Sequence, residues 1–400
     1  MIELDTFGRV AKQFGTPVYV YEEDKIRNQL LSLRKNIRYD PKTILYAVKA
    51  NSNPHILDII KGPGVGIDAV SPGEVSLALM AGFLPSSILF TGNNITDEEM
   101  DFVAERGALL NIDSLSRLEK FGKKYPGSNV SVRINPDVGA GHHDHCITGG
   151  PKSKFGIWYS QVDEINRTAK EYRLKIIGIH EHIGSQILEV DKFLAAMDVL
   201  LKVAPNFPSL QFIDFGGGLG VPYRPEEDPL PIKKLGQRMS ERFTEFCGRY
   251  GRPLTLVIEP GRYLVAEAGF LLTKVNTVKR NPDGRVFVGV DSGFNHLVRP
   301  AMYGSFHPIT NISNLNGEKE KVDIVGNLCE SGDKFAEDRD LRQAREGDLI
   351  LIGVAGAYGY SMSSNYNLRP RPPEVLVKPG GILQLIRERE TIEKITGGTK

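Results

Sequence analysis

Three features that could do chemistry follow separate apolar segments of the chain. Lys49 ends one segment, the glycines of Gly216-Gly-Gly218 follow another, and Glu259 ends a third, just before Pro260-Gly-Arg262. A lysine flanked by packed side chains is poorly solvated, which makes its amine a better nucleophile for imine chemistry. Consecutive glycines expose backbone N–H groups and let an anion approach closely. A nearby carboxylate can keep the ring nitrogen of a bound aromatic cofactor protonated.

Together these groups indicate pyridoxal phosphate, a cofactor that requires an imine-forming lysine, a phosphate-binding loop and a partner for its ring nitrogen. Each group alone has a simpler explanation, since a lone lysine at a strand end usually reaches solvent and a glycine run is often a flexible turn. No Lys-Ser or Lys-Thr pair follows the glycines, which excludes a Walker loop, and a dinucleotide fingerprint is absent as well. The carboxylate of Glu259 favours carbanion chemistry, because an arginine in its place would leave the ring a poorer electron sink.

These residues need a scaffold that brings distant segments together, and the sequence predicts an α/β fold of the (β/α)8 TIM-barrel type. Eight short apolar or β-branched runs alternate with helical patterns, which is typical of parallel βαβ units. The carboxyl ends of the strands of such a barrel meet at one mouth, where Lys49, Asp68, Arg133, His180-Glu-His182 and Glu259 would lie. An open doubly wound sheet is the alternative. The expected strands are residues 43–49, 66–70, 88–90, 108–113, 129–135, 175–183, 210–216 and 254–260.

Helix starts are expected between these strands. Asn53-Pro54 offers an N-cap followed by proline at the first helical position. Residues 193–203 have apolar side chains at helical spacing. Three pairs have the spacing of a capping box: Ser71 with Glu74, Thr96 with Glu99, and Ser116 with Glu119.

Beyond about residue 270, strand-like runs recur without long helices, and turn residues such as Asn281-Pro-Asp-Gly284 separate them. We therefore expect a C-terminal mostly-β domain, a β-sandwich or barrel, which also takes an early strand at residues 18–21. The expected division is an N-terminal strand of the β domain in residues 1–25, the barrel in 26–270 and the C-terminal β domain in 271–400. The strands expected in that domain are 270–278, 285–290, 321–326, 348–354 and 374–377.

The composition excludes several classes of function. The 400 residues include 50 basic and 49 acidic side chains, a net charge of +1, so there is no general basic field to bind nucleic acid. The chain has no apolar run long enough for a membrane span, and its first residues lack the pattern of a signal peptide. Three scattered cysteines are too few for a disulfide framework. We therefore expect a cytoplasmic protein that binds neither nucleic acid nor membrane.

Five short motifs occur in an order that identifies a family. They are Tyr46-Ala-Val-Lys-Ala-Asn51, His182-Ile-Gly-Ser-Gln186, Gly216-Gly-Gly218, Glu259-Pro-Gly-Arg262 and Cys329-Glu-Ser331. From about residue 14 to about residue 377 the chain resembles the fold-type III pyridoxal-phosphate amino-acid decarboxylases, and within them the group that acts on diaminopimelate. The resemblance implies decarboxylation of meso-2,6-diaminopimelate to L-lysine and CO2, the last step of lysine biosynthesis.

The resemblance also implies roles for individual residues toward the cofactor. Lys49 matches the lysine that holds pyridoxal phosphate, His182 the imidazole stacked on its ring, and Glu259 the acid at its ring nitrogen. Tyr358 matches a residue that touches both cofactor and substrate. The other expected cofactor contacts are Asp68, Arg133, Ser185, Gly217, Gly218, Gly261 and Arg262.

For the amino-acid substrate, the resemblance implies that Arg299 and Tyr303 bind the distal carboxylate with help from Arg262. Glu330 matches the acceptor for the distal ammonium. Cys329 matches the acid that protonates the carbanion. In the family, Cys329 and Glu330 enter the site from the other subunit, so an obligate homodimer with a shared active site is expected.

One segment departs from the family pattern. It reads Gly141-His-His-Asp-His-Cys-Ile-Thr-Gly-Gly150, where a loop resembling Ile-Ser-Thr-Gly usually precedes Lys154-Phe-Gly156. The part from His142 to Cys146 contains metal-ligating residue types, but adjacent ligands do not easily converge on one ion, so we expect a polar lid and no metal. The departure bears on substrate choice, because a lid contacts what it covers.

Three other functions remain open. A related decarboxylase could act on ornithine, arginine, carboxynorspermidine or a carrier-bound amino acid, although Arg299 with Glu330 favours a zwitterionic distal end. An amino-acid racemase of similar fold would prefer an arginine to Glu259. A non-enzymatic barrel protein that only carries the cofactor would lack the second domain that supplies Cys329.

Overall fold

The computed structural model describes residues 2–137, 139, 148–150 and 153–398. The chain divides into two compact units. One comprises residues 1–29, 222–227 and 264–400, and we call it the β unit. The other comprises residues 30–221 and 228–263, and we call it the barrel unit.

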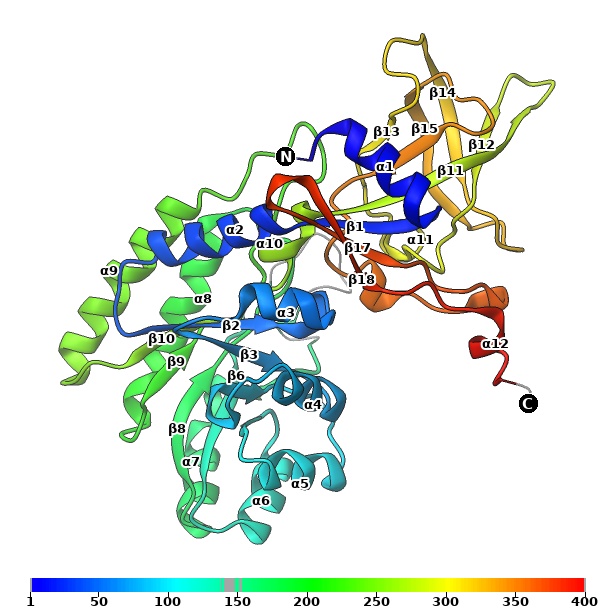
Figure 1. The fold of residues 1–400 in the computed structure, drawn as a ribbon. Coiled ribbons are helices and arrows are strands. Elements are labelled where there is room, and N and C mark those ends of the chain that lie inside the picture. Colours follow the sequence, from blue (N-terminus) through cyan, green and yellow to red (C-terminus); the bar gives the residue numbers. More distant parts are fainter. Residues whose placement is uncertain (1, 138, 140–147, 151–152, 399–400) are drawn as a thin grey trace. The chain divides into compact units, whose positions relative to one another are not determined.

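The barrel unit contains a closed ring of eight parallel strands (Figure 1). The ring closes because β10 pairs with β2, while β5 pairs with β6. The two-residue strand β7 (Ile157–Trp158) adds to β6 outside this ring. The eight-stranded closure confirms the predicted (β/α)8 barrel and excludes the open doubly wound sheet. The strands in ring order are β2 (Lys42–Ala47), β3 (Val65–Ala69), β4 (Ile88–Phe90), β5 (Leu109–Ile112), β6 (Asn129–Asn135), β8 (Lys175–His180), β9 (Phe212–Asp214) and β10 (Thr255–Ile258).

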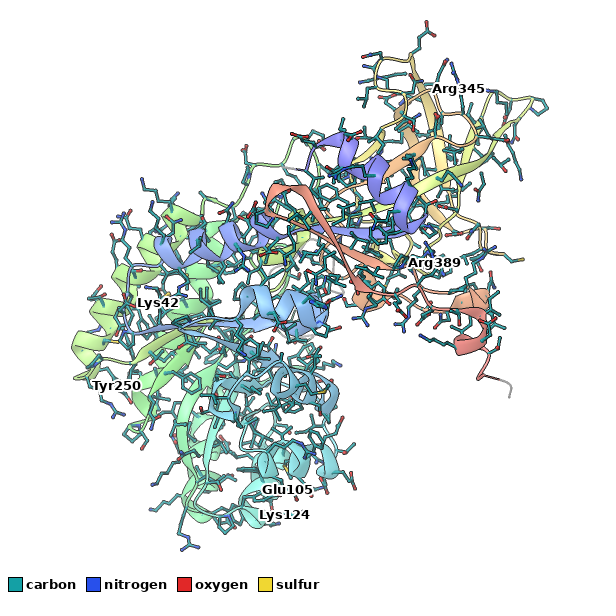
Figure 2. The ribbon with its side chains drawn as sticks, viewed as in Figure 1. Lys42, Glu105, Lys124, Tyr250, Arg345 and Arg389 are labelled. Atoms are coloured by element: carbon teal, nitrogen blue, oxygen red, sulfur yellow. The ribbon has the colours of Figure 1, made fainter. Side chains whose placement is uncertain are left out.

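Helices alternate with these strands and flank the ring (Figure 1). Their ends carry charged side chains, among them Glu105 and Lys124, which are labelled in Figure 2. Over the ranges given above, no helix is both long and apolar enough to cross a membrane. The helices are α2 (Glu23–Asn36), α3 (Pro54–Ile60), α4 (Pro72–Met80), α5 (Asp97–Glu105), α6 (Leu115–Lys124), α7 (Val162–Glu171), α8 (Val190–Val203) and α9 (Ile232–Tyr250).

The predicted helix starts are correct at Asn53, Ser71 and Thr96 but wrong at Ser116. Asn53 caps α3 with its side chain, followed by proline as expected. Thr96 and Glu99 form a reciprocal capping box at the start of α5. The box expected at Ser116 does not form, because α6 begins two residues earlier and is capped by Ser114. Only Ser116 has the glutamate three residues later that defines the box, but serine is a favoured N-cap at either position.

Most barrel strands end earlier than predicted, which places functional residues in the loops that follow them. Strand β2 ends at Ala47, and Lys49 lies in the short 3-10 turn Val48–Ala50. Strand β8 ends at His180, so His182 belongs to the following loop. Loops at the carboxyl ends of barrel strands are the usual location of active-site groups.

The β unit contains a mixed sheet into which the N-terminal strand is inserted. Strand β1 (Val18–Glu22) pairs antiparallel with β11 (Gly269–Arg280) and parallel with β17 (Glu374–Lys378). Apolar side chains of helix α1 (Leu4–Phe14) pack against these strands in one buried cluster. The prediction of a mostly-β domain that takes an early strand is therefore confirmed. The remaining elements are β12 (Val286–Val290), α11 (Arg299–Tyr303), β13 (Ile309–Asn311), β14 (Lys319–Val325), β15 (Lys334–Arg342), β16 (Leu349–Ile352), β18 (Ile382–Arg387) and α12 (Ile392–Ile395).

Three strands of the β unit are not predicted by the sequence analysis. Strand β13 has three residues, which is too short for a recognisable pattern. Strands β15 and β18 are the two end strands along the main path of the sheet. Strand β15 reads Lys334-Phe-Ala-Glu-Asp-Arg-Asp-Leu-Arg342, and its charged side chains hide the apolar alternation that identifies inner strands. Strand β18 has four apolar residues of six, so its sequence carries a strand signal that sequence reasoning overlooked.

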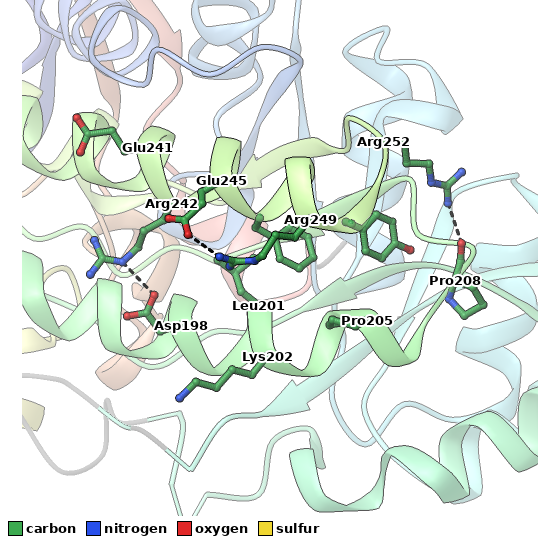
Figure 3. Close-up of a pocket in the computed structure, with 12 residues that line it drawn as sticks. Asp198, Leu201, Lys202, Pro205, Pro208, Glu241, Arg242, Glu245, Arg249 and Arg252 are labelled. Atoms are coloured by element: carbon green, nitrogen blue, oxygen red, sulfur yellow. Dashed lines mark hydrogen bonds and ion pairs between the residues drawn. The ribbon is translucent and has the colours of Figure 1, made fainter.

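A groove of about 1020 Å³ lies between α8 and α9 in the helix layer of the barrel unit (Figure 3). Two of its arginines are paired within the groove, Arg242 with Asp198 at 2.9 Å and Arg249 with Glu245 at 2.5 Å. Its walls belong to the outer helices and not to the carboxyl ends of the strands. The groove is therefore separate from the mouth where the predicted catalytic residues lie.

Candidate active site

Lys49 lies beside Asp68 at the carboxyl end of the barrel. Its ammonium forms an ion pair with Asp68, whose other carboxylate oxygen accepts a hydrogen bond from Thr91. Asp68 is fully buried, whereas the Lys49 side chain is 34% exposed. Burial raises the pKa of the Asp68 carboxyl, Glu259 raises it further, and Lys49 opposes this rise. The amine is thus held by a fixed partner while remaining accessible.

Glu259 follows β10 and is buried against His180 at the end of β8. The Nε2 atom of His180 lies 3.0 Å from Oε2 of Glu259. Burial, and then the positive charge of Arg133, hold the pKa of His180 well below its usual range. The imidazole is therefore neutral and donates its Nε2–H to the carboxyl group. This hydrogen bond fixes the orientation of Glu259 at the mouth.

Asp214, at the end of β9, forms a second contact with Glu259. The two carboxyls are hydrogen-bonded to each other, which requires a proton between them. Burial and the neighbouring Glu259 raise the pKa of Asp214 well above its usual range. The pKa of Glu259 is also raised, chiefly by burial, but Lys49 and Arg133 oppose that rise. Asp214 therefore holds the proton of the pair and Glu259 accepts it.

His180, Asp214 and Glu259 each place one possible ligand atom within 4.8 Å of the others. Such a group could hold a cation by its composition alone. However, Lys49 and Arg133 already act electrostatically on Glu259. The shared proton of the two carboxyls and these two cations balance the buried negative charge, so we interpret the cluster as a carboxylate site for an organic group.

The glycine loop follows β9 and packs against the loop after β8. A Cβ at Gly217 would collide with the carbonyl oxygen of Glu259, and one at Gly218 would collide with that of Gly184. Gly218 also has a φ of +92°, which side chains rarely tolerate. Glycine is therefore required here by the close approach of other backbone segments, a reason that the sequence analysis does not give. Asp214 supports the turn by accepting the N–H of Gly216 at 2.8 Å.

His182 lies between the glycine loop and Arg133. The N–H of Gly217 donates to Nδ1 of His182 at 3.0 Å, and Nη2 of Arg133 donates to the His182 carbonyl at 3.4 Å. Burial, and then Arg133 and Lys49, hold the pKa of the His182 imidazole well below its usual range. A neutral imidazole in this position offers a ring face without a competing charge.

Ser185 and Arg262 connect the loops after β8 and β10. Nη2 of Arg262 donates to Oγ of Ser185 at 2.9 Å. Gly261, just before Arg262, is packed so closely that a Cβ would lie 3.0 Å from Ala50 and 3.1 Å from Ala47. A hydroxyl, a guanidinium and a glycine loop are the groups expected to bind a phosphate.

The barrel residues fit pyridoxal phosphate on these observations. Lys49 supplies a partly exposed amine, and Glu259 supplies a buried carboxylate whose electrostatic interaction with Lys49 places the two near each other. The loops around Gly217, Ser185 and Arg262 carry a glycine backbone, a hydroxyl and a guanidinium, the kinds of group that bind an anion. All the predicted cofactor contacts except Tyr358 belong to the barrel unit.

The other predicted residues belong to the β unit. Arg299 begins helix α11 and is buried, and Tyr303 ends this helix half-buried. Tyr358 is half-buried and has a φ of +57°, a left-handed conformation that is unfavourable for a tyrosine. Such strain is often found where a side chain is held for function.

Cys329 and Glu330 lie on an exposed loop between β14 and β15. The buried carboxylate of Asp333 holds this loop by accepting the N–H groups of Phe294 at 2.6 Å and Leu328 at 2.8 Å. The thiol and the carboxylate are thus presented on an anchored loop of the β unit.

Sequence reasoning missed the roles of two groups at the barrel mouth. His180 is placed there by the strand pattern but receives no role, although it contacts Glu259 directly. Thr91 contacts Asp68 and is not identified at all. Its signal is its position immediately after β4, at the same strand end as Asp68.

The unusual segment from His142 to Cys146 lies outside the described residues. Thr148, which follows it, donates its hydroxyl to the carbonyl oxygen of His182 at 2.7 Å. Thr148 therefore contacts the loop that carries His182.

Comparisons with known proteins agree with this geometry. Residues 23–266 match the family model described as pyridoxal-dependent decarboxylase, pyridoxal binding domain. A diaminopimelate decarboxylase of Methanothermobacter thermautotrophicus is 47% identical, over 97% of this chain and 92% of that protein. A crystal structure of a diaminopimelate decarboxylase has a TM-score of 0.90 at 38% identity, covering 97% of this chain and 94% of the other. The Helicobacter pylori diaminopimelate decarboxylase, complexed with L-lysine, has a TM-score of 0.89 at 34% identity, covering 97% and 98%.

The family model covers more than half of the chain, and the relatives extend over nearly all of it. The chain therefore belongs to the family of pyridoxal-dependent decarboxylases that contains the diaminopimelate decarboxylases.

Proposed function

We propose that this protein is a pyridoxal-phosphate-dependent carboxy-lyase that converts meso-2,6-diaminopimelate to L-lysine and CO2, the last step of lysine biosynthesis. The observation that carries the reaction type is the buried carboxylate of Glu259, oriented by His180 and electrostatically coupled to Lys49. The substrate follows from the diaminopimelate decarboxylases that cover nearly the whole chain. With three scattered cysteines and no basic field, we propose a cytoplasmic enzyme.

When bound, pyridoxal phosphate provides an electron sink for the bond pair that remains at Cα as CO2 leaves. Lys49 would hold the cofactor through its side-chain amine. The carboxylate of Glu259 keeps the ring nitrogen protonated, and neutral His182 is assigned to the ring face. Asp68 holds the Lys49 amine through its ion pair. The loops around Ser185 and Arg262, with the glycines, bind the phosphate.

The β unit is assigned to substrate recognition. The distal end of diaminopimelate carries one carboxylate and one ammonium group. The planar guanidinium of Arg299 suits the carboxylate, with Tyr303 and Arg262 as further donors, and Glu330 suits the ammonium. A substrate without a distal carboxylate would leave the buried Arg299 without this partner, which is unfavourable. Tyr358 completes the contacts to cofactor and substrate.

A panel assay tests the substrate. We expect kcat/KM for CO2 release from meso-diaminopimelate to exceed that from lysine, ornithine or arginine by at least about 10³-fold, because sites built around polar partners strongly reject analogues that lack them. CO2 release is measured with each amino acid at several concentrations, and a Lys49→Ala variant gives the background. Comparable release from ornithine or arginine would assign the enzyme to another substrate.

We further propose a homodimer in which Cys329 of one subunit delivers the proton to the substrate carbanion bound in the barrel of the other. This proposal is supported by the exposure of Cys329 and Glu330 on an anchored loop. A thiol that acts as an acid on a neighbouring subunit must be presented at the surface of its own chain.

Subunit mixing tests this arrangement. Lys49→Ala and Cys329→Ala chains, co-expressed with different tags, are expected to recover about a quarter of wild-type activity, because half of the random dimers are mixed and one of their two sites is intact. Activity is measured in the unfractionated mixture and in doubly purified dimers. Lys49→Ala mixed with Glu259→Gln is the control. This mixture recovers nothing, since each change disables the barrel of its own subunit. Absence of recovery in the first mixture would contradict sharing of the site.

A further inference from the structure

Arg299 is a large cation in the interior of the β unit. It is the first residue of helix α11, and only 2% of it is exposed. A buried guanidinium is stable only when neighbouring groups satisfy its donors. The identity of those neighbours determines how much of its positive charge remains for a ligand.

Two aromatic side chains contact this guanidinium. Its Cζ lies 4.6 Å from the ring centroid of Tyr223, and its Nη1 lies 3.1 Å from Nε2 of His307. The rings of Tyr223 and His307 meet edge to face, with centroids 5.2 Å apart and planes at 83°. Arg299 is therefore held by a ring face on one side and by an imidazole nitrogen at one of its amino groups.

The hydrogen bonds of His307 determine which of its nitrogens carries the proton. Nδ1 lies 3.0 Å from the carbonyl oxygen of Gly353, which can only accept. Nδ1 therefore carries the hydrogen. Nε2 then presents its lone pair to Arg299, which can only donate. Both contacts are satisfied by a single neutral tautomer, and His307 is fully buried in this arrangement.

The backbone around His307 is fixed from both sides. Arg339 donates from Nη1 to the His307 carbonyl at 2.8 Å and stacks on Phe306, with its Cζ 3.8 Å from the ring centroid. The N–H of Gly353 donates to the Pro308 carbonyl at 2.8 Å. The imidazole thus connects Arg299 to a rigid part of the sheet, where β13 pairs with β16.

We propose that His307 is a positioning residue that orients Arg299 for the distal carboxylate of the substrate. Because His307 is neutral, it does not itself neutralise the positive charge of Arg299. The inference rests on the proposed role of Arg299 in substrate binding. An acidic residue in place of His307 would fix the guanidinium equally well, but it would compete with the substrate carboxylate for the same cation. A neutral acceptor fixes one amino group, and because the guanidinium is planar this also fixes the plane of its other donors.

Two substitutions separate the two hydrogen bonds of His307. In His307→Gln the amide oxygen takes the position of Nε2 and can still accept from Arg299. In His307→Asn the amide nitrogen takes the position of Nδ1 and can still donate to Gly353, but the acceptor for Arg299 is lost. Comparison of the two variants therefore distinguishes a role of His307 in orienting Arg299 from a role in maintaining the fold.

The affinity for two ligands is measured by calorimetric titration of the cofactor-loaded enzyme. The ligands are L-lysine and 1,5-diaminopentane, which lacks the carboxylate. We expect His307→Asn to weaken lysine binding by about 10- to 100-fold and His307→Gln by less than about threefold. Binding of 1,5-diaminopentane should change by less than about threefold in both variants. A lysine affinity unchanged in folded His307→Asn would overturn the proposal.

An Arg299→Ala variant separates this inference from the proposed function beneath it. If Arg299→Ala binds lysine as tightly as the wild type, the assignment of Arg299 to the substrate is wrong, and the role of His307 is lost with it. If Arg299→Ala weakens lysine binding and His307→Asn does not, only the role of His307 is wrong. Should His307→Asn fail to fold, His307→Gln decides alone, since tenfold weaker lysine binding in this variant contradicts the orientation argument.

Discussion

A Lys49→Arg variant is expected to lose at least about 10⁴-fold of the decarboxylation rate while remaining folded. Arginine keeps a positive charge beside Asp68, so the buried carboxylate retains an ion partner. Its guanidinium stays protonated at all ordinary pH values and cannot form the imine with the cofactor aldehyde. The variant therefore removes the nucleophile without removing the charge, and the loss of rate reports covalent chemistry alone.

Borohydride reduction followed by peptide mass analysis measures this directly. In the wild type the cofactor mass should appear on the peptide that contains Lys49, and in Lys49→Arg it should be absent from it. Lys42→Arg is the matched control, because Lys42 begins the same strand β2 at the opposite end and pairs with Asp40 at 3.1 Å (Figure 2). A cofactor label on another lysine of the wild-type protein would exclude the assignment of Lys49.

Glu259→Gln is expected to lower kcat by about 10²- to 10³-fold with a much smaller change in KM, as is usual when one electrostatic stabiliser of the transition state is removed. Glutamine has the same shape and can still meet His180, but it cannot hold the ring nitrogen in its protonated form. Steady-state kinetics and the absorbance spectrum of the bound cofactor provide the two measurements.

Glu181→Gln is the matched control for this change. Glu181 is as buried as Glu259 and lies next to His180, but the charge that acts on it is Asp198 of helix α8. Burial raises the pKa of Glu181 well above its usual range, and glutamine has nearly the same shape as its protonated form. A similar loss of kcat in both variants would indicate a general effect of removing a buried acid, and not a role of Glu259 at the cofactor.

The barrel could be predicted from sequence because its strands are inner strands with continuous apolar runs. Even the three-residue strand β4 is buried throughout. The edge strand β15 could not be predicted in this way, since its exposed, charged side chains remove the apolar pattern. The edge strand β18 keeps four apolar residues of six and was overlooked despite that signal. The local pattern also misleads at α6, where only Ser116 has the spacing of a capping box but Ser114 is the N-cap.

The candidate site follows the same logic. Lys49, Glu259 and the glycine loop could be found because each breaks an apolar strand pattern at its carboxyl end. The ion pair of Lys49 with Asp68 and the sharing of a proton between Asp214 and Glu259 join residues that are distant in sequence. Such partners depend on how neighbouring strands align in the ring, which sequence spacing does not reveal. His307 was missed for the same reason, because its role depends on its hydrogen bonds with both Gly353 and Arg299.

Strand β1 is synthesised before the barrel segment, but its partner strands are synthesised after it. Its neighbours in the sheet, β11 and β17, leave the ribosome only after the whole barrel segment has been translated. The segment Val18–Glu22, which is almost entirely buried in the finished sheet, is therefore without its native partners through most of translation. The barrel can close during that interval, whereas the apolar side chains of Val18–Glu22 wait for the strands that cover them. Chaperones that act at the ribosome would have their longest opportunity on this segment.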